Sequence, residues 1–209
     1  MQRRHWMLTP NRNAWAGLLA RRPDLASEPL VAAWAERGFP LVLRRPLEDE
    51  PPGEVPLGLP LPPGLGKRRL ALTLPERDIV SIQPPPRLAA AAATAPAAWQ
   101  GTIAALLRLD AGTRCFGSLA WHYLTGLSYL SPASDLDLLW ELPAQPSSLL
   151  DGIAAIAGAA PMQIDGEVQG SSGAAQWREL HASCDHVAVK NDTAVVLMAK
   201  GAFLACAPS

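Results

Sequence analysis

The stretch Gly117–Trp140, GSLAWHYLTGLSYLSPASDLDLLW, carries the pattern that decides the fold. It opens with a Gly-Ser step between a short β-rich run and a helical run, and it closes with an apolar segment that reads as a strand. This last segment contains Asp135 and Asp137. Because alternate residues of a strand share a face, both carboxylates are expected on one side of a sheet, and Leu136 and Leu138 on the other.

Asp135 and Asp137 are interpreted as metal ligands. Two neighbouring carboxylates in an apolar strand repel each other, and loss of hydration adds to the cost of keeping both charged. A divalent cation offsets both effects, and Mg²⁺ prefers one or two carboxylates together with phosphate oxygens of a substrate. We therefore expect Mg²⁺ here, with Mn²⁺ as the alternative ion. The competing interpretation is a strand end whose aspartates only face solvent.

Gly117 and Ser118 are interpreted as a phosphate-binding step. A glycine lets the backbone approach a phosphate closely, Ser118 can cap the helix, and the free N–H groups of a helix start favour an anion. The competing interpretation is an ordinary serine N-cap. Together with the Asp-x-Asp strand, this step describes a site for in-line phosphoryl or nucleotidyl transfer.

A third catalytic carboxylate is expected from a neighbouring strand at 161–168, PMQIDGEV. Asp165 and Glu167 have the same parity in that strand and so share a face. Asp165 is favoured because Ile164 precedes it in the strand body, whereas Gly166 can bend the chain before Glu167. The competing interpretation is a β-turn at the Asp-Gly dipeptide.

The segments around this stretch predict an α/β (α+β) protein. Helical signals at 99–109 and 148–157 alternate with strand signals at 161–168, 174–180 and 186–189, which is typical of a mixed sheet with flanking helices. The run QPPPR at 83–87 favours a stiff linker. We therefore expect a catalytic domain at 87–209 and a smaller N-terminal domain, for binding the substrate or a partner, at 1–86.

The N-terminal domain is expected to be proline-rich α/β. Its signals are a helix at 28–37, strands at 40–45 and 67–74, and loops or at most an edge strand at 46–66. Its basic cluster, Lys67, Arg68 and Arg69, suits phosphate groups, although a solvated edge strand would also carry such charges. Residues 1–104 hold 13 Lys and Arg against 9 Asp and Glu, whereas residues 105–209 hold 5 against 10, so an anionic substrate fits the basic front half.

Several classes of protein are excluded or disfavoured. A net charge of −1 argues against nucleic-acid binding. The uncharged stretch 88–107 is rich in alanine and interrupted by Pro96, which predicts two helical pieces and no membrane span. Three cysteines, at 115, 184 and 206, are too few for a disulfide scaffold and favour the cytoplasm. The histidines and cysteine at 181, 184 and 186 offer zinc only three ligands at an unusual spacing.

The segment Gly117–Trp140 resembles the nucleotidyltransferase motif of the malonate decarboxylase holo-acyl-carrier-protein synthases, also called phosphoribosyl-dephospho-CoA transferases. The Gly-Ser and Asp-x-Asp elements alone belong to a wide superfamily, whereas TGL, SDLDLLW and GKRR together are far more specific. The resemblance covers nearly the whole chain. Its further elements are Trp34, PLVLRR at 40–45, the segment from Gly58, Gly66–Arg69, Pro84-Pro85, IDGEV at 164–168 and Trp177–Leu180.

The resemblance implies a reaction. Members of this family move a phosphoribosyl-dephospho-CoA group from 2'-(5''-triphosphoribosyl)-3'-dephospho-CoA to a serine of the acyl carrier protein subunit of malonate decarboxylase, and pyrophosphate leaves. By this resemblance Asp135 and Asp137 hold Mg²⁺, and Asp165 is a third ligand or base. Gly117 and Ser118 grip the departing phosphates, and the basic cluster at 67–69 neutralises charge.

Two other functions compete with this one. A different nucleotidyltransferase, which moves AMP or another nucleotide onto a protein, an RNA or a small molecule, would keep the aspartate pair and change donor and acceptor. A carrier-protein binding module with a decayed site would be no enzyme. The intact Gly-Ser and Asp-x-Asp elements argue against the second of these.

Overall fold

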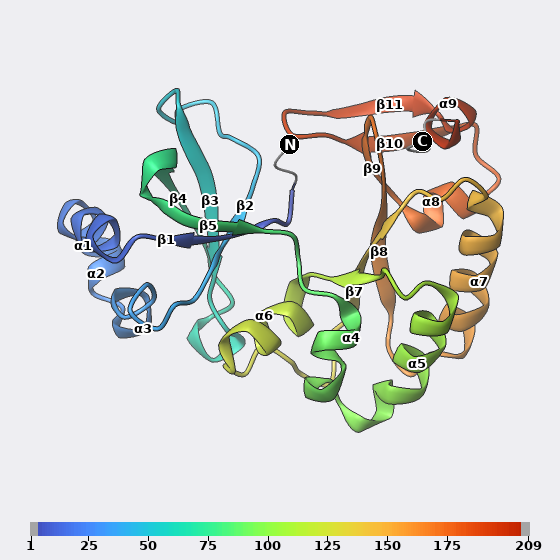
Figure 1. Cartoon of the computed structure of the whole chain (residues 1–209), viewed down its shortest axis with the longest axis horizontal. Coiled ribbons are helices and arrows are strands. Elements are labelled where there is room, and N and C mark those ends of the chain that lie inside the picture. The colour runs from blue at the N-terminus through green and yellow to red at the C-terminus, as the bar shows by residue number, and fades with distance from the viewer. Residues whose placement is uncertain (1–3, 206–209) are drawn as a thin grey trace. The chain divides into compact units, whose positions relative to one another are not determined.

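Figure 1 shows a computed structural model of the chain, in which residues 4–205 are described. The chain forms two compact units, Met1–Pro84 and Pro85–Ser209, which we call the N-terminal and the C-terminal unit. Each combines helices with one sheet, which confirms the mixed α+β class expected from the sequence. Cys206 lies outside the described residues.

The N-terminal unit is built on a five-stranded antiparallel sheet with the order β4-β3-β2-β1-β5. Two buried tryptophans secure its helical segment: the indole N–H of Trp15 donates to the backbone oxygen of Val31 over 3.0 Å, and that of Trp34 donates to Pro40 over 2.9 Å. Its elements are β1 (Met7–Pro10), α1 (Arg12–Arg21), α2 (Pro23–Ala26), α3 (Pro29–Ala32), β2 (Leu41–Leu43), β3 (Glu54–Pro60), the short 3₁₀ helices Pro63–Leu65 and Glu76–Asp78, β4 (Arg69–Pro75) and β5 (Ile79–Gln83).

Strand β3 corrects the expectation that 46–66 holds loops or at most an edge strand. It is an interior strand that pairs with β2 on one side and β4 on the other. Its prolines are tolerated because of the side to which they turn. Pro56 accepts from the backbone N–H of Arg44 over 3.1 Å, so its backbone faces the β2 side, and Pro60 faces the same way by alternation. Strand β2 pairs only with Gly58 and Leu57, so neither proline removes a ladder hydrogen bond.

The helix expected at 28–37 is shorter in the structure. It is regular only over α3 and continues as turns up to Gly38. Gly38 has a φ of 70°, which is the left-handed conformation of a glycine that ends a helical segment.

The C-terminal unit contains a six-stranded mixed sheet with the order β11-β10-β9-β8-β7-β6. Strands β7 and β8 run parallel, joined by the crossover helix α7, and the other neighbouring strands are antiparallel. Its elements are α4 (Leu88–Ala91), the 3₁₀ helices Ala92–Thr94 and Ala97–Trp99, α5 (Gln100–Leu109), β6 (Arg114–Cys115), α6 (Gly117–Thr125), β7 (Leu136–Glu141), α7 (Pro146–Ala159), β8 (Ile164–Gly170), β9 (Gly173–Gln176), α8 (Trp177–His181), β10 (His186–Lys190), β11 (Val195–Ala199) and α9 (Lys200–Leu204).

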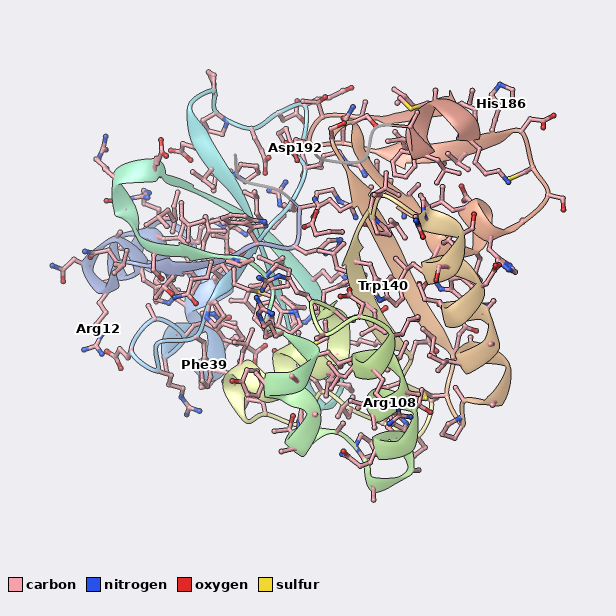
Figure 2. All side chains as sticks on the ribbon, turned by 45° about the vertical axis from the view of Figure 1, so that its right-hand side comes forward. Arg12, Phe39, Arg108, Trp140, His186 and Asp192 are labelled. Carbon is pink, nitrogen blue, oxygen red and sulfur yellow. The ribbon has the colours of Figure 1, made fainter. Side chains whose placement is uncertain are left out.

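The two faces of this sheet differ in chemistry. One face carries the apolar side chains of Leu136, Leu138 and Trp140, all buried, and Figure 2 shows Trp140 inside the unit and His186 at its periphery. The other, which we call the polar face, alternates with them along the same strands. Register places these side chains on the polar face: Arg114 from β6, Asp137 from β7, Asp165 and Glu167 from β8, Gln176 from β9 and Lys190 from β10.

Two further expectations meet different outcomes. The stretch 88–107 is indeed helical in pieces interrupted at Pro96, and no helix within residues 4–205 is long and apolar enough to cross a membrane. The strand expected at 174–180 is half wrong. Only β9 is extended, and the chain then turns into α8, where the buried Trp177 and Leu180 lie three residues apart, at the helical spacing.

Candidate active site

Gly117 forms the junction between β6 and α6. Its φ of 60° lies in the left-handed region, which side chains with a β-carbon rarely adopt. The backbone N–H of Phe116 donates to the backbone oxygen of Asp137 over 3.0 Å, which ties the junction to β7. A β-carbon on Gly117 would overlap with Oδ2 of Asp137. The carboxylate of Asp137 therefore lies directly against the backbone at which α6 begins.

The structure corrects the expected role of Ser118 as the helix cap. Helix α6 begins two residues earlier, at Gly117, with Phe116 as N-cap and without a side-chain capping bond. Ser118 therefore lies inside the first turn, half-buried, and its hydroxyl has no hydrogen-bond partner among residues 4–205. The first-turn N–H groups have no partner within the helix, so they and this hydroxyl are available to an anion.

The two aspartates of the Asp-x-Asp element have different surroundings. Strand β7 begins at Leu136, so Asp135 lies immediately before the strand and is exposed. Asp137 lies within the strand and is half-buried. The competing interpretation, in which both aspartates only face solvent, is wrong for Asp137 because its carboxylate packs against Gly117.

Asp165 lies beside Asp137. The two residues are in register across the parallel strands β7 and β8, so their side chains leave the same face of the sheet from neighbouring positions. The alternative of a β-turn at Asp165-Gly166 is wrong, because both residues are inside β8. This register brings a carboxylate of the second strand to the Asp-x-Asp element.

One oxygen of Asp165 is held by two donors. Its Oδ1 accepts from the backbone N–H of Gly166 over 2.9 Å and from the side-chain amide of Gln176. Its Oδ2 makes no hydrogen bond within the described range. The amide oxygen of Gln176 in turn accepts from the backbone N–H of Arg178 over 2.6 Å, so this side chain caps α8 and orients Asp165 together.

Gln176 is a site residue that reading the sequence missed. A glutamine before Trp177-Arg178-Glu179 suggests a helix start at most. Its contact with Asp165 depends on the β8–β9 hairpin, in which Glu167 pairs with Gln176, and no local pattern predicts that register.

Glu167 is occupied by a different partner. Its side chain is almost fully buried, and its Oε1 accepts from Nζ of Lys190 over 2.8 Å. A buried carboxylate with an ammonium partner is stabilised in its charged form and is committed to that pair. Of the two candidates for the third carboxylate, Asp165 is therefore the one with a free oxygen beside Asp137.

Lys190→Met is expected to lower the free energy of unfolding by about 2 kcal/mol, because it leaves the buried Glu167 without its ammonium partner. The double variant with Glu167→Gln is expected to recover at least half of that loss. Urea unfolding of the three proteins measures both effects. Equal stability of the single and the double variant would show that the pair contributes nothing.

The donor set fits a metal only in part. Within residues 4–205, no three His, Cys, Asp or Glu side chains gather closely enough to hold a metal ion by themselves. Asp135 and Asp137 match instead the pattern in which Mg²⁺ takes one or two carboxylates and completes its shell with phosphate oxygens. Because Gly117 has no side chain, the carboxylate of Asp137 can lie against the start of α6. This position suits a carboxylate that shares a metal ion with substrate phosphates.

The basic cluster at 67–69 lies in the N-terminal unit, where a turn leads into β4, of which Arg69 is the first residue. Lys67 has a φ of 54°, and all three side chains are exposed. Arg68 forms an ion pair with Glu28, so its charge is already partly used. Lys67 and Arg69 have no ion-pair or hydrogen-bond partner through their side chains in the part of the chain that the structure describes.

The surroundings of Cys115, Cys184 and His181 indicate structural roles for these side chains. Burial raises the pKa of the Cys115 thiol to about 12, so this thiol stays protonated at neutral pH. Cys184 donates to the backbone oxygen of Glu179 over 3.1 Å, and His181 lies 3.3 Å from Asp151. Cys184 and His181 thus each have a partner of their own, and Cys115 is a buried, protonated thiol.

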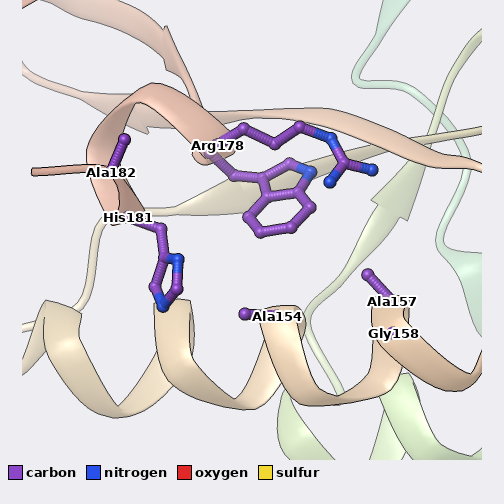
Figure 3. Close-up of a pocket in the computed structure, with 7 residues that line it drawn as sticks. Ala154, Ala157, Gly158, Arg178, His181 and Ala182 are labelled. Atoms are coloured by element: carbon purple, nitrogen blue, oxygen red, sulfur yellow. The ribbon is translucent and has the colours of Figure 1, made fainter.

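A groove of about 320 Å³ lies between α7 and α8 (Figure 3). Its floor is made by the small residues Ala154, Ala157 and Gly158 of α7, and Trp177 and His181 line its other side. The guanidinium of Arg178 stacks on the Trp177 ring, 4.4 Å from its centre. The groove contains none of the predicted catalytic, metal-binding or phosphate-binding residues, although Trp177 and Arg178 belong to the resemblance and His181 is one of the rejected zinc candidates.

Comparison with known proteins agrees with the resemblance. Residues 87–201 match the C-terminal domain of phosphoribosyl-dephospho-CoA transferase MdcG, and residues 3–85 match its N-terminal domain. The phosphoribosyl-dephospho-CoA transferase of Bradyrhizobium diazoefficiens is 39% identical over 208 residues, which cover 96% of this chain and 92% of that protein. The protein of the same name from Xanthomonas campestris pv. campestris strain 8004 is 35% identical over 202 residues, 91% of this chain and 95% of that one.

No solved structure shows a significant match. The family matches nevertheless cover nearly the whole chain, and their boundary falls in the proline run between the two units. The chain therefore belongs to the phosphoribosyl-dephospho-CoA transferase family, as the resemblance of Gly117–Trp140 predicted.

Proposed function

We propose that this transferase moves the phosphoribosyl-dephospho-CoA group from 2'-(5''-triphosphoribosyl)-3'-dephospho-CoA to a serine of the acyl carrier protein subunit of malonate decarboxylase. Membership of the family supports the donor group. One structural observation carries the chemistry: Asp137 lies against the Gly117 junction and in register with Asp165. A helix start that suits phosphate is thus joined to two carboxylates on one sheet face.

Asp135 and Asp137 would hold Mg²⁺, or Mn²⁺ in its place, which would polarise the donor phosphate and lower the pKa of the serine hydroxyl. Gly117 and Ser118 bind the departing phosphates through backbone N–H groups and the serine hydroxyl. Asp165 keeps Oδ1 fixed by two donors and offers Oδ2 to the proton of the attacking serine.

The bond changes balance without a further reactant. The serine oxygen bonds to the phosphorus next to the ribose. The bond between that phosphorus and the oxygen that joins it to the second phosphorus breaks, and pyrophosphate leaves. The serine proton passes to Asp165 or to water. In this scheme the polar face of the C-terminal unit performs nucleotidyl-type transfer. Lys67, Arg68 and Arg69 of the N-terminal unit stay predicted phosphate-binding residues, because their exposed charges suit an anion.

Intact-mass spectrometry tests the proposal. The carrier subunit, incubated with this protein, Mg²⁺ and the triphosphoribosyl donor, is expected to gain the mass of the donor minus pyrophosphate, and EDTA is expected to abolish the gain. A gain of one AMP with ATP, and none with the triphosphoribosyl donor, would move the function to another nucleotidyltransferase. No gain with any nucleotide would favour the non-enzymatic binding module.

The cytoplasmic location stays a prediction, to be checked by fractionation.

A further inference from the structure

Two arginines of the C-terminal unit lie directly opposite each other. Arg87 and Arg114 form an antiparallel β-bridge. The backbone bonds flank the pair: Leu88 N–H donates to Thr113 over 2.9 Å, and Cys115 N–H donates to Pro86 over 2.9 Å. This makes the arginines a non-hydrogen-bonded pair, the arrangement in which opposite side chains come closest. Like charges so placed destabilise the fold.

Within residues 4–205, neither arginine has an ion pair that would compensate for this repulsion. Arg87 is exposed, and its guanidinium makes no hydrogen bond or ion pair with the described residues. Arg114 is half-buried and donates Nη1 to the backbone oxygen of Pro85 over 2.6 Å, which is a neutral acceptor. Burial and the charge of Arg87 both lower the pKa of Arg114, while Glu141 raises it. Two guanidiniums are held together although neither has a carboxylate bound to it.

The pair is close to the candidate catalytic carboxylates. Arg114 pairs with Leu139 across β6 and β7, so it shares the polar face with Asp137, two residues away along β7. Such diagonal neighbours are about 7–8 Å apart at their α-carbons. Arg87, across the bridge, belongs to the same edge of the sheet. Positive charge beside a carboxylate pair suits a ligand with several phosphates, one part held by cations and another by a metal.

We propose that Arg87 and Arg114 form a phosphate-binding site that holds a phosphoryl group of the donor. Planar guanidiniums with free N–H groups bind phosphate oxygens through charge-assisted hydrogen bonds, and a bound dianion would relieve their mutual repulsion. The donor offers two sources of this chemistry: the pyrophosphate that leaves, and the diphosphate of the dephospho-CoA part. The identity of the donor rests on the proposed function, whereas the phosphate chemistry rests on the arginine pair.

Isothermal titration of the full-length protein tests the site. The probes are pyrophosphate and 3'-dephospho-CoA, each titrated in EDTA so that no metal held by carboxylates contributes. Arg87→Gln is expected to lower the affinity for at least one probe about tenfold, because one charge-assisted contact is lost. The matched control is Arg108→Gln, an exposed arginine of α5 without a side-chain partner in the described range, which is expected to change affinity less than twofold.

The test separates the sources and the role of Arg87. If Arg87→Gln lowers the affinity for pyrophosphate alone, the site is assigned to the leaving group. If it lowers the affinity for 3'-dephospho-CoA alone, the site is assigned to the diphosphate of the CoA part. The unliganded Arg87→Gln protein is expected to melt no lower than wild type, because the change removes repulsion and breaks no hydrogen bond or ion pair among the described residues. Wild-type affinity of Arg87→Gln for both probes, or no binding of either by wild type at millimolar concentration, overturns the proposal. Neither result depends on the acceptor, so a failed transfer assay leaves this test intact.

Discussion

Asp137→Asn is expected to lower the rate of group transfer at least a hundredfold while the protein keeps its fold. The substitution preserves size, so the packing against Gly117 stays, but it removes the negative charge that would hold the metal. Intact-mass assays under single-turnover conditions measure the rate, and circular dichroism with thermal melting checks the fold. Asp135→Asn is expected to act in the same direction, since the two aspartates are proposed to share the ion.

A matched control comes from the same unit. Asp192 is an exposed aspartate remote in sequence from the site, and Asp192→Asn removes the same charge from the protein (Figure 2). It is expected to leave the transfer rate unchanged within twofold. A rate within tenfold of wild type for Asp137→Asn would show that the metal ligands have been wrongly assigned.

Gly117→Ala is expected to damage both stability and transfer. The new β-carbon would overlap with Oδ2 of Asp137, and alanine is also strained at a φ of 60°. Strain of about 1 kcal/mol and a collision of about 1–3 kcal/mol should together lower the free energy of unfolding by about 2–4 kcal/mol. The displaced carboxylate should also reduce transfer in the molecules that remain folded. Urea unfolding and the mass assay measure the two effects.

A substitution at Gly126 is the control that separates the backbone strain of Gly117→Ala from its steric collision. It ends α6 with a φ of 69°, and a β-carbon there meets nothing within 4 Å. Gly126→Ala is therefore expected to cost only the strain, about 1 kcal/mol, with transfer close to wild type. If both variants lost the same stability and activity, the close packing between Gly117 and Asp137 would contribute neither to stability nor to transfer.

Much of the C-terminal unit is readable from its sequence because its elements are locally consistent. The apolar segment at 134–140 predicts β7, and the run at 99–109 predicts the helix that the structure places at Gln100–Leu109. Among the elements that were missed in the N-terminal unit, which also include α1, α2 and β3, β1 and β5 are short strands that pair with each other across most of the unit. Their stability comes from that pairing, which no window of neighbouring residues contains.

The candidate site was predictable as residue types and only partly as geometry. Strand parity puts Asp165 and Glu167 on one face, but it takes the parallel register of β7 and β8 to bring Asp165 beside Asp137, and a distant strand to bind Glu167 to Lys190. Arg87 falls in the proline run, where the sequence suggested only a linker. The bridge to Arg114 needs β6 to return beside that run, and no local signal encodes it.

The contact between Gly117 and Asp137 also offers a way to interpret relatives known only from their genes. Since the carboxylate occupies the volume of a β-carbon, any homologue with a side chain at the position of Gly117 must have moved or lost this aspartate. A single codon thus sorts sequences that can assemble this junction from those that cannot, before any protein is made. Selection for new donors should vary the surrounding residues and leave this position fixed.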